Sequence, residues 1–162
     1  MTNAATYIQD LNLQPHPEGG YYKETYRAER LVDIASFNGT RNVSTAIYFL
    51  LEGNNKSHFH KIKSDELWFY HDGASLEIFV LSKTETTLIR LGKNIANGEV
   101  LQAVVPANTW FASKVKNNEG FVLVSCTVSP GFSFEDFEMA TKDHLKMEFH
   151  NAIEIIEEMT LS

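Results

Sequence analysis

Eight short segments rich in aromatic and β-branched residues follow one another along the chain, and they constrain its fold more than any other feature. Clusters rich in Gly, Asn, Asp and Lys, such as HDGA and KNNEG, separate them. The segments are YYKETYR, STAIYFLL, DELWFYH, SLEIFVLS, TTLIRLG, VLQAVVP, TWFASKV and FVLVSCTV. Short strands with turn residues between them, and no helical spacing, predict antiparallel sheets that close into a barrel or pack face to face.

Helical patterns occur only at the two ends of this run. Residues 3–11 predict a short helix with Asn3 as its N-cap, which the following prolines and Gly pair end. After Pro130, apolar residues recur at helical spacing, which predicts C-terminal helices over about residues 139–160. The pattern therefore indicates one all-β domain with helical ends.

The length of 162 residues agrees with a single domain over residues 1–162, whose barrel core we expect over about residues 20–130. The net charge is -7, and no cluster of Lys and Arg stands out, which argues against nucleic acid and anionic membranes as partners. No apolar run approaches the roughly 18 residues of a membrane span. The N-terminus lacks the features of a secretory signal, and the single Cys126 favours a reducing compartment, so we expect a cytoplasmic protein.

A motif in the middle of the chain carries the first resemblance to a known family. Gly53, His58, His60, Glu66 and Gly73 follow the order Gly-x4-His-x-His-x5-Glu-x6-Gly. This resembles the first signature of the cupin superfamily, although the usual spacing between the second His and the Glu is one residue shorter.

The second cupin signature is only partly present. Gly98 and the segment VPANTWF, residues 105–111, are its counterpart, and Phe111 stands where that signature supplies a His. Five blocks between residues 13 and 138 narrow the resemblance to the RmlC-like cupin family of uncharacterised function. They are HPEGGYY, STAIYFLL, SDELWFYHDG, VVPANTW and CTVSPGFSFEDFE. The resemblance implies a β-barrel or jelly roll, a homodimer, and a pocket for a small molecule at the barrel mouth.

A metal centre is one hypothesis for the histidine motif. Residues two apart on a strand share a face, so His58 and His60 are expected to point to the same side, and Glu66 arrives on the next strand. Two His and one carboxylate suit a divalent metal with open coordination positions. The longer spacing before Glu66, and Phe111 in place of the fourth ligand, count against it.

Metal-free acid/base chemistry is the leading hypothesis for the same residues. A histidine beside a carboxylate in a partly dry barrel has a proton affinity that its surroundings can tune near neutral pH. We expect His60 to act as the base and Glu66 as its partner, in an isomerase or epimerase reaction on a carbohydrate-like or nucleotide-sugar-like molecule. A metal-dependent oxygenase or isomerase and a non-catalytic ligand-binding protein remain alternatives.

The remaining candidates are expected to bind the ligand. Alternation along residues 65–73 places Trp68 and Tyr70 on the face of Glu66. The resemblance favours Glu18, in the rigid HPEGG loop, as a pocket residue. Tyr22, Tyr48 and Trp110 complete the set of predicted ligand-binding residues, and Cys126 is expected to be a buried, unreactive thiol.

Overall fold

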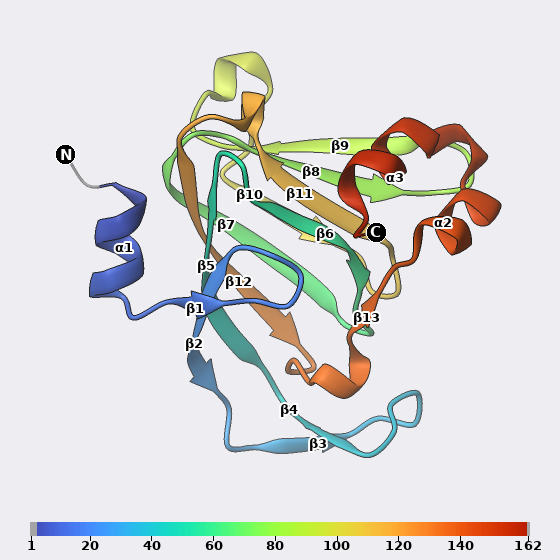
Figure 1. Ribbon diagram of the computed structural model, residues 1–162. Helices are drawn as coiled ribbons and strands as arrows, with labels where there is room; N and C mark the ends of the chain where they lie inside the picture. Colours follow the sequence, from blue (N-terminus) through green and yellow to red (C-terminus); the bar gives the residue numbers. More distant parts are fainter. Residues whose placement is uncertain (1–2, 162) are drawn as a thin grey trace.

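The computed structural model describes residues 3–161, and two antiparallel sheets form its body (Figure 1). In spatial order, the six-stranded sheet contains β1 (Gln14–Pro15), β2 (Tyr21–Arg27), β5 (Thr45–Glu52), β12 (Phe121–Ser129), β7 (Asp65–Gly73) and β10 (Gln102–Val105). The five-stranded sheet contains β13 (Glu138–Met139), β6 (Lys56–Lys61), β11 (Phe111–Val115), β8 (Leu76–Leu81) and β9 (Thr86–Leu91). This architecture confirms the predicted all-β fold.

The predicted helices are also present at both ends of the described chain. Helix α1 (Ala4–Asp10) begins at Asn3, whose side chain accepts a hydrogen bond from the Thr6 N–H at 2.9 Å, as expected of an N-cap. The C-terminal part contains α2 (Lys142–Glu148) and α3 (Ile153–Met159), joined by the 3-10 turn η4 (His150–Ala152). The other short 3-10 turns are η1 (Ile95–Asn97), η2 (Lys116–Asn118) and η3 (Phe134–Asp136).

The C-terminal helices cover the outer face of the five-stranded sheet. Their apolar stripe, which includes Leu145, Ile156 and Met159, packs on Phe59 of that sheet and on Trp110, which precedes β11. Burial of each such side chain stabilises the fold by roughly 1.5–3 kcal/mol. Figure 1 shows α2 and α3, in red, beside β6 and β11. No helix among residues 3–161 is both long enough and apolar enough to cross a membrane.

A small separate sheet projects from the body at the end of the barrel where β2 and β12 end (Figure 1). It consists of β3 (Leu31–Asp33) and β4 (Thr40–Asn42), which pair only with each other. Arg41, the middle residue of β4, bonds Asp136 of η3, with nitrogen–oxygen distances of 2.6 and 2.9 Å. The ribbon and η3 are therefore fixed to each other across one end of the barrel.

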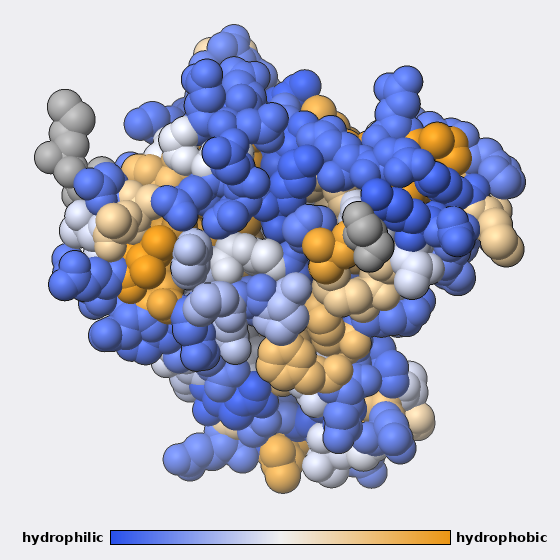
Figure 2. All heavy atoms as spheres, viewed as in Figure 1, coloured by the Kyte–Doolittle hydropathy of each residue, from blue (hydrophilic) through white to orange (hydrophobic). Residues whose placement is uncertain are grey.

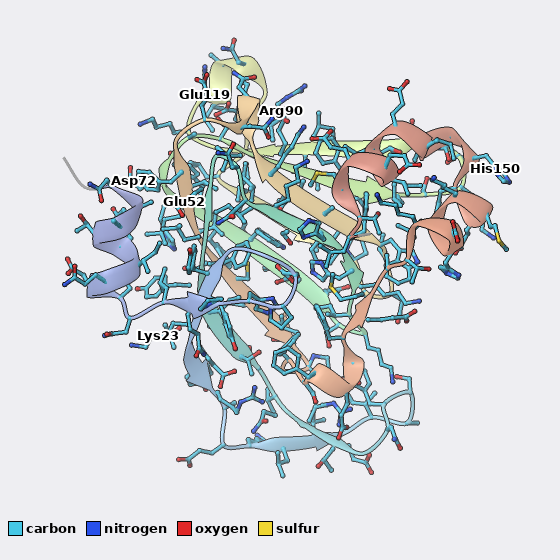
Figure 3. All side chains as sticks on the ribbon, in the orientation of Figure 1. Lys23, Glu52, Asp72, Arg90, Glu119 and His150 are labelled. Atoms are coloured by element: carbon cyan, nitrogen blue, oxygen red, sulfur yellow. The ribbon has the colours of Figure 1, made fainter. Side chains whose placement is uncertain are left out.

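The opposite end of the barrel is closed by tight turns. Figure 3 shows Glu52, Asp72 and Glu119 together at that end, far from β3 and β4. Gly73 there has a φ of 95°, and a Cβ at this position would lie 2.1 Å from the Phe121 carbonyl oxygen. Only glycine fits this close approach of two chains.

Three bulges interrupt the regular alternation of the strands. They lie at Thr25 in β2, between Ser57 and His60 in β6, and at His71 in β7, where each partner strand is one residue shorter. A bulge shifts the residues after it to the other face of the sheet. Each therefore changes which side chains enter the barrel.

Candidate functional site

A cavity of about 680 Å³ lies inside the barrel, at the end next to β3, β4 and η3. Its walls combine polar side chains with apolar and aromatic ones, and the latter include Phe49, Trp68, Ile47 and Val128. A pocket of this size and lining is typical of a site for one small organic molecule.

The loop before β2 places an acid at the inner end of this cavity. Gly19 has a φ of 113°, and a Cβ there would lie 1.9 Å from the Lys56 carbonyl oxygen. The loop can press against β6 in this way only because the residue is glycine. As a result, the Glu18 carboxylate is buried and lines the cavity.

Glu18 is held by hydrogen bonds from β6. Its Oε1 accepts a bond from the Ser57 hydroxyl at 2.9 Å, and its Oε2 lies 2.9 Å from His60 Nε2. Burial by itself raises the pKa of Glu18, but the charge and the hydrogen bond of His60 outweigh burial, so its pKa is lowered. Glu18 is therefore a carboxylate at neutral pH.

Both ring nitrogens of His60 have partners that require a proton on the nitrogen. Nδ1 lies 2.7 Å from the His58 carbonyl oxygen, which can only accept, and Nε2 faces the Glu18 carboxylate. Burial lowers the pKa of His60, but the carboxylate of Glu18 more than compensates, and the pKa is raised. His60 is therefore a buried imidazolium that forms an ion pair with Glu18.

Glu66 is buried in the same cavity without a cation of its own. Its side chain comes from β7, it is 8% exposed, and no Lys, Arg or His within the described residues lies within ion-pair distance of it. Burial, and then the charge of Glu18, raise the pKa of Glu66 to about 7. Near neutral pH this carboxyl can thus either give or take a proton.

Cys126 lies beside this carboxyl. The thiol is buried, as expected from the sequence, and it lines the cavity. Burial and the charge of Glu66 raise the pKa of Cys126 well above its usual value, so it remains a neutral thiol.

His16 adds a second imidazole to the cavity wall. Its Nδ1 accepts a hydrogen bond from the Glu18 N–H at 3.2 Å, and its ring packs against Tyr22, with 4.6 Å between the ring centres. Burial lowers the pKa of His16 despite the nearby Glu18 carboxylate. At neutral pH this ring is uncharged, unlike that of His60.

His58 does not join His60 in the cavity. The bulge in β6 breaks the alternation between them, so that Ser57 shares with His60 the side facing the Glu18 carboxylate. The Nδ1 and the backbone N–H of His58 instead bond the Glu18 carbonyl oxygen, at 2.7 and 2.8 Å. The expectation that the two imidazoles share one face is wrong for this reason.

This arrangement does not fit the metal set His58, His60 and Glu66. A histidine ligates through a ring nitrogen that carries no proton, whereas His60 has a hydrogen-bond acceptor at each nitrogen. Phe111 packs on the His60 ring, with 4.2 Å between ring centres, where the family signature would provide another ligand. Within residues 3–161, no three His, Cys, Asp or Glu side chains are grouped so as to hold a metal.

Five of the predicted site residues lie together in the cavity wall. They are Glu18, Tyr22, His60, Glu66 and Trp68. Their functional roles stay predictions.

Tyr48, Tyr70 and Trp110 lie away from the cavity. Tyr48 packs in the cluster beneath α1, and Trp110 packs under the C-terminal helices. Tyr70 faces the barrel interior as expected, but its hydroxyl donates a 2.6 Å hydrogen bond to the Gly73 carbonyl oxygen at the closed end.

The sequence reasoning missed several residues at the cavity mouth. Arg27 enters the lining because of the bulge at Thr25, which regular alternation would not place there. Arg41 comes from the separate ribbon, and no local pattern indicates where that ribbon docks. Three phenylalanines of the segment after β12 also line the cavity: Phe132, Phe134 and Phe137.

Comparison with known proteins agrees with this fold. Residues 5–140 match the family model described as Cupin superfamily (DUF985). The chain belongs to this cupin family. The Uncharacterized protein YML079W of Saccharomyces cerevisiae is 35% identical over 153 residues, which cover 86% of this chain and 76% of the yeast protein.

Two solved structures resemble this cupin along its whole length. A hypothetical protein from Leishmania major is 35% identical with a TM-score of 0.94, covering 99% of this chain and 100% of its own. Protein SO0799 from Shewanella oneidensis is 38% identical with a TM-score of 0.91, covering 99% of each chain. These likenesses confirm the cupin jelly roll with its short N-terminal helix and its C-terminal helices, and the names of these proteins assign no activity.

Proposed function

We propose that this cupin binds a small organic molecule in the barrel cavity and catalyses a metal-independent proton transfer on it, with Glu66 as the group that moves the proton. The observation that carries the proposal is the Glu66 carboxyl, which lies in a cavity of about 680 Å³, has no cationic partner among the described residues, and has a pKa of about 7. A general base works best when its pKa lies near the working pH.

The reaction class is isomerisation or epimerisation next to a carbonyl group. The Glu66 carboxylate takes the proton from the carbon beside the carbonyl, and the C–H electron pair moves into an enolate. Glu66 then returns the proton to the neighbouring carbon, which gives isomerisation, or to the opposite face of the first carbon after the enolate has turned over in the cavity, which gives epimerisation. The step changes no oxidation state overall and needs no other reactant.

His60 has a different role in this proposal from the one expected from the sequence. It has no free N–H and no free lone pair, because the His58 carbonyl and the Glu18 carboxylate occupy its two nitrogens. Its positive charge acts on Glu66, whose pKa it lowers against the effect of burial. The same charge favours the negative charge that develops on an enolate in a dry site. Glu18 keeps His60 protonated, and its own negative charge raises the pKa of Glu66.

Deuterium exchange tests the proposal even while the substrate is unidentified. A panel of cyclic and acyclic carbonyl compounds is incubated with the protein in D₂O, and loss of the proton beside the carbonyl is followed by ¹H NMR. We expect at least one compound to exchange with the wild-type protein, and Glu66→Gln to lose that exchange by a factor of about 10² or more. Exchange that persists in Glu66→Gln, or metal that co-purifies stoichiometrically and is needed for the exchange, would contradict the proposal.

A further inference from the structure

Three cationic side chains line the cavity, and their free hydrogen-bond donors decide whether an anionic ligand can bind there. They are His60, Arg27 and Arg41, since His16 is uncharged at neutral pH. Proteins bind phosphate and carboxylate groups mainly through charge-assisted N–H bonds, often in pairs from one arginine. An arginine has five N–H donors, and each one already engaged within the protein is withdrawn from a ligand.

Arg41 has no donor left. Its Nε and Nη2 donate to Asp136 at 2.6 and 2.9 Å, and Nη2 also donates to Glu135 at 3.2 Å. Its Nη1 donates to the carbonyl oxygens of Asn38 and Thr40 at 3.2 and 2.9 Å. The side chain is buried between the ribbon and η3. It therefore supports the cavity wall and offers no free N–H donor to a ligand.

Arg27 is occupied almost as fully, and Glu24 takes its paired donors. Nε and Nη2 each donate to one oxygen of the Glu24 carboxylate at 2.8 Å. The pair of N–H groups that could bind a phosphate in a bidentate way is therefore already engaged. Nη2 also donates to the Phe132 carbonyl oxygen at 3.1 Å, and Nη1 donates to the Asn42 side chain at 2.8 Å. One N–H of Nη1 remains, which is too little for bidentate recognition.

The balance of charge in the cavity points in the same direction. His60 is paired with Glu18, Arg27 with Glu24, and Arg41 with Asp136. Glu66 then adds an acidic group that forms no ion pair with a cation in the described part of the chain. A phosphate entering the cavity would meet this carboxyl and no unpaired cation.

The walls, in contrast, suit an uncharged ring. Tyr22, Phe49 and Trp68 face the interior, and Phe134, which is 53% exposed, stands at the mouth. Figure 2 shows an apolar patch above η3 on a face that is otherwise mostly hydrophilic. Aromatic faces pack well against the apolar faces of rings, while Glu18 and Glu66 can accept hydrogen bonds from hydroxyl groups.

We infer that the cavity takes an uncharged, ring-bearing small molecule with hydroxyl or carbonyl groups, and that Glu24 excludes phosphorylated and nucleotide-linked forms by occupying Arg27. The inference rests on the proposed function in one respect, since both place the substrate in the same cavity. It narrows the ligand class expected from the sequence, because a nucleotide sugar carries a diphosphate that would find no free cationic donor.

Glu24→Gln tests the role of Glu24. The substitution releases Arg27 from its carboxylate while leaving the buried residues unchanged, and Glu138→Gln is the matched control. Glu138 pairs with Lys61 outside the cavity at 3.1 Å, so the control makes the same change in net charge without freeing an arginine of the site. Pyrophosphate is titrated into the wild-type protein and both variants, and the Arg27 Nε–H and the His60 ring signals are followed by NMR.

We expect pyrophosphate to shift these signals only in Glu24→Gln, with affinity at least about tenfold above that of the wild type and of Glu138→Gln, as expected for one freed charge-assisted pair. Wild-type binding as tight as that of Glu24→Gln, or no gain in Glu24→Gln, would overturn the role of Glu24.

Thymidine and thymidine 5′-diphosphate provide the matched ligand pair. On the wild-type protein we expect thymidine to shift the Trp68 indole and His60 signals at lower concentration than its diphosphate does. Tighter binding of the diphosphate overturns the proposed ligand class. Neither measurement depends on turnover or on a Glu66 variant. Failure of these binding tests would therefore leave the deuterium-exchange test valid, and failure of the exchange test would leave the argument from the arginine donors valid.

Discussion

The two ends of the barrel interior are both buried, yet they are built from opposite kinds of side chain. The closed end is filled by Leu76, Ile78 and Val115, each with no exposed surface. The open end buries Glu18, His60 and Glu66 around a cavity. Apolar packing stabilises a fold, whereas burial of an ionisable group opposes it unless a partner compensates. The open end therefore retains charges that stability alone does not favour, which is typical of a functional site.

The largest effect should come from breaking the compensated pair at the open end. Glu18→Gln leaves the His60 imidazolium buried without its carboxylate, and we expect a loss of roughly 3–5 kcal/mol in the free energy of unfolding at neutral pH. The pKa of His60 should fall, because burial then acts without Glu18 to oppose it. Urea unfolding and the pH titration of the His60 ring signals measure the two effects. A variant that unfolds like the wild type and keeps a cationic His60 at neutral pH would contradict this picture.

At the closed end, truncation should cost stability without affecting the chemistry of the site. Leu76→Ala removes a fully buried side chain from the packed core, for which a loss of about 2–5 kcal/mol is usual. The pKa of Glu66 should stay as it is, because no charged group near it changes. Urea unfolding together with ¹³C NMR of the Glu66 carboxyl tests both statements. A shift in that pKa would show that the two ends are not independent.

Removal of the Glu66 charge should raise the free energy of unfolding, in contrast to the two substitutions above. The pKa of Glu66 lies at about 7, above its ordinary value of 4.5, so between these values the folded protein binds more protons than the unfolded chain. Stability attributable to this group is thus lost as the pH rises from about 4.5 through 7. Because glutamine does not titrate, Glu66→Gln should not lose stability in this pH range. It should be more stable than the wild type above pH 7 by up to about 3 kcal/mol, with little difference near pH 4.

The measurement is the pH dependence of the difference between Glu66→Gln and the wild type in urea unfolding. Glu135→Gln is a suitable control, since this carboxyl also lines the cavity but is exposed at the mouth. A difference that does not grow with pH would mean that Glu66 is not the group that titrates near neutrality.

The comparison also explains which features could be predicted from the sequence. Strands, the N-terminal helix and the C-terminal helices follow from local patterns, and the closed end follows from apolar alternation within regular strands. Glu18, His60 and Glu66 were found through the family motifs and Trp68 through strand alternation, and the structure places them in the cavity together with Tyr22.

The rest of the site depends on features that local patterns do not encode. Because of the bulge in β6, the side chain of Ser57 and not that of His58 lies beside the Glu18 carboxylate. The bulge at Thr25 brings Arg27 into the cavity lining. Arg41 reaches the cavity only because its ribbon docks on η3. The partner of His60 was taken to be Glu66, its neighbour in sequence, whereas the loop carrying Glu18 provides it from a distant position.

The central claim is that Glu66 is a buried carboxyl without an ion-pair partner and that it exchanges a proton near neutral pH. Its pKa can be measured directly by ¹³C NMR of the labelled side-chain carboxyl, assigned by comparison with Glu66→Gln. The structure predicts a pKa of about 7 for Glu66, with Glu18 remaining ionised well below that pH. A Glu66 pKa near the ordinary value of 4.5 would contradict the account, since the carboxylate would then have a partner or a solvent exposure that this structure does not give it.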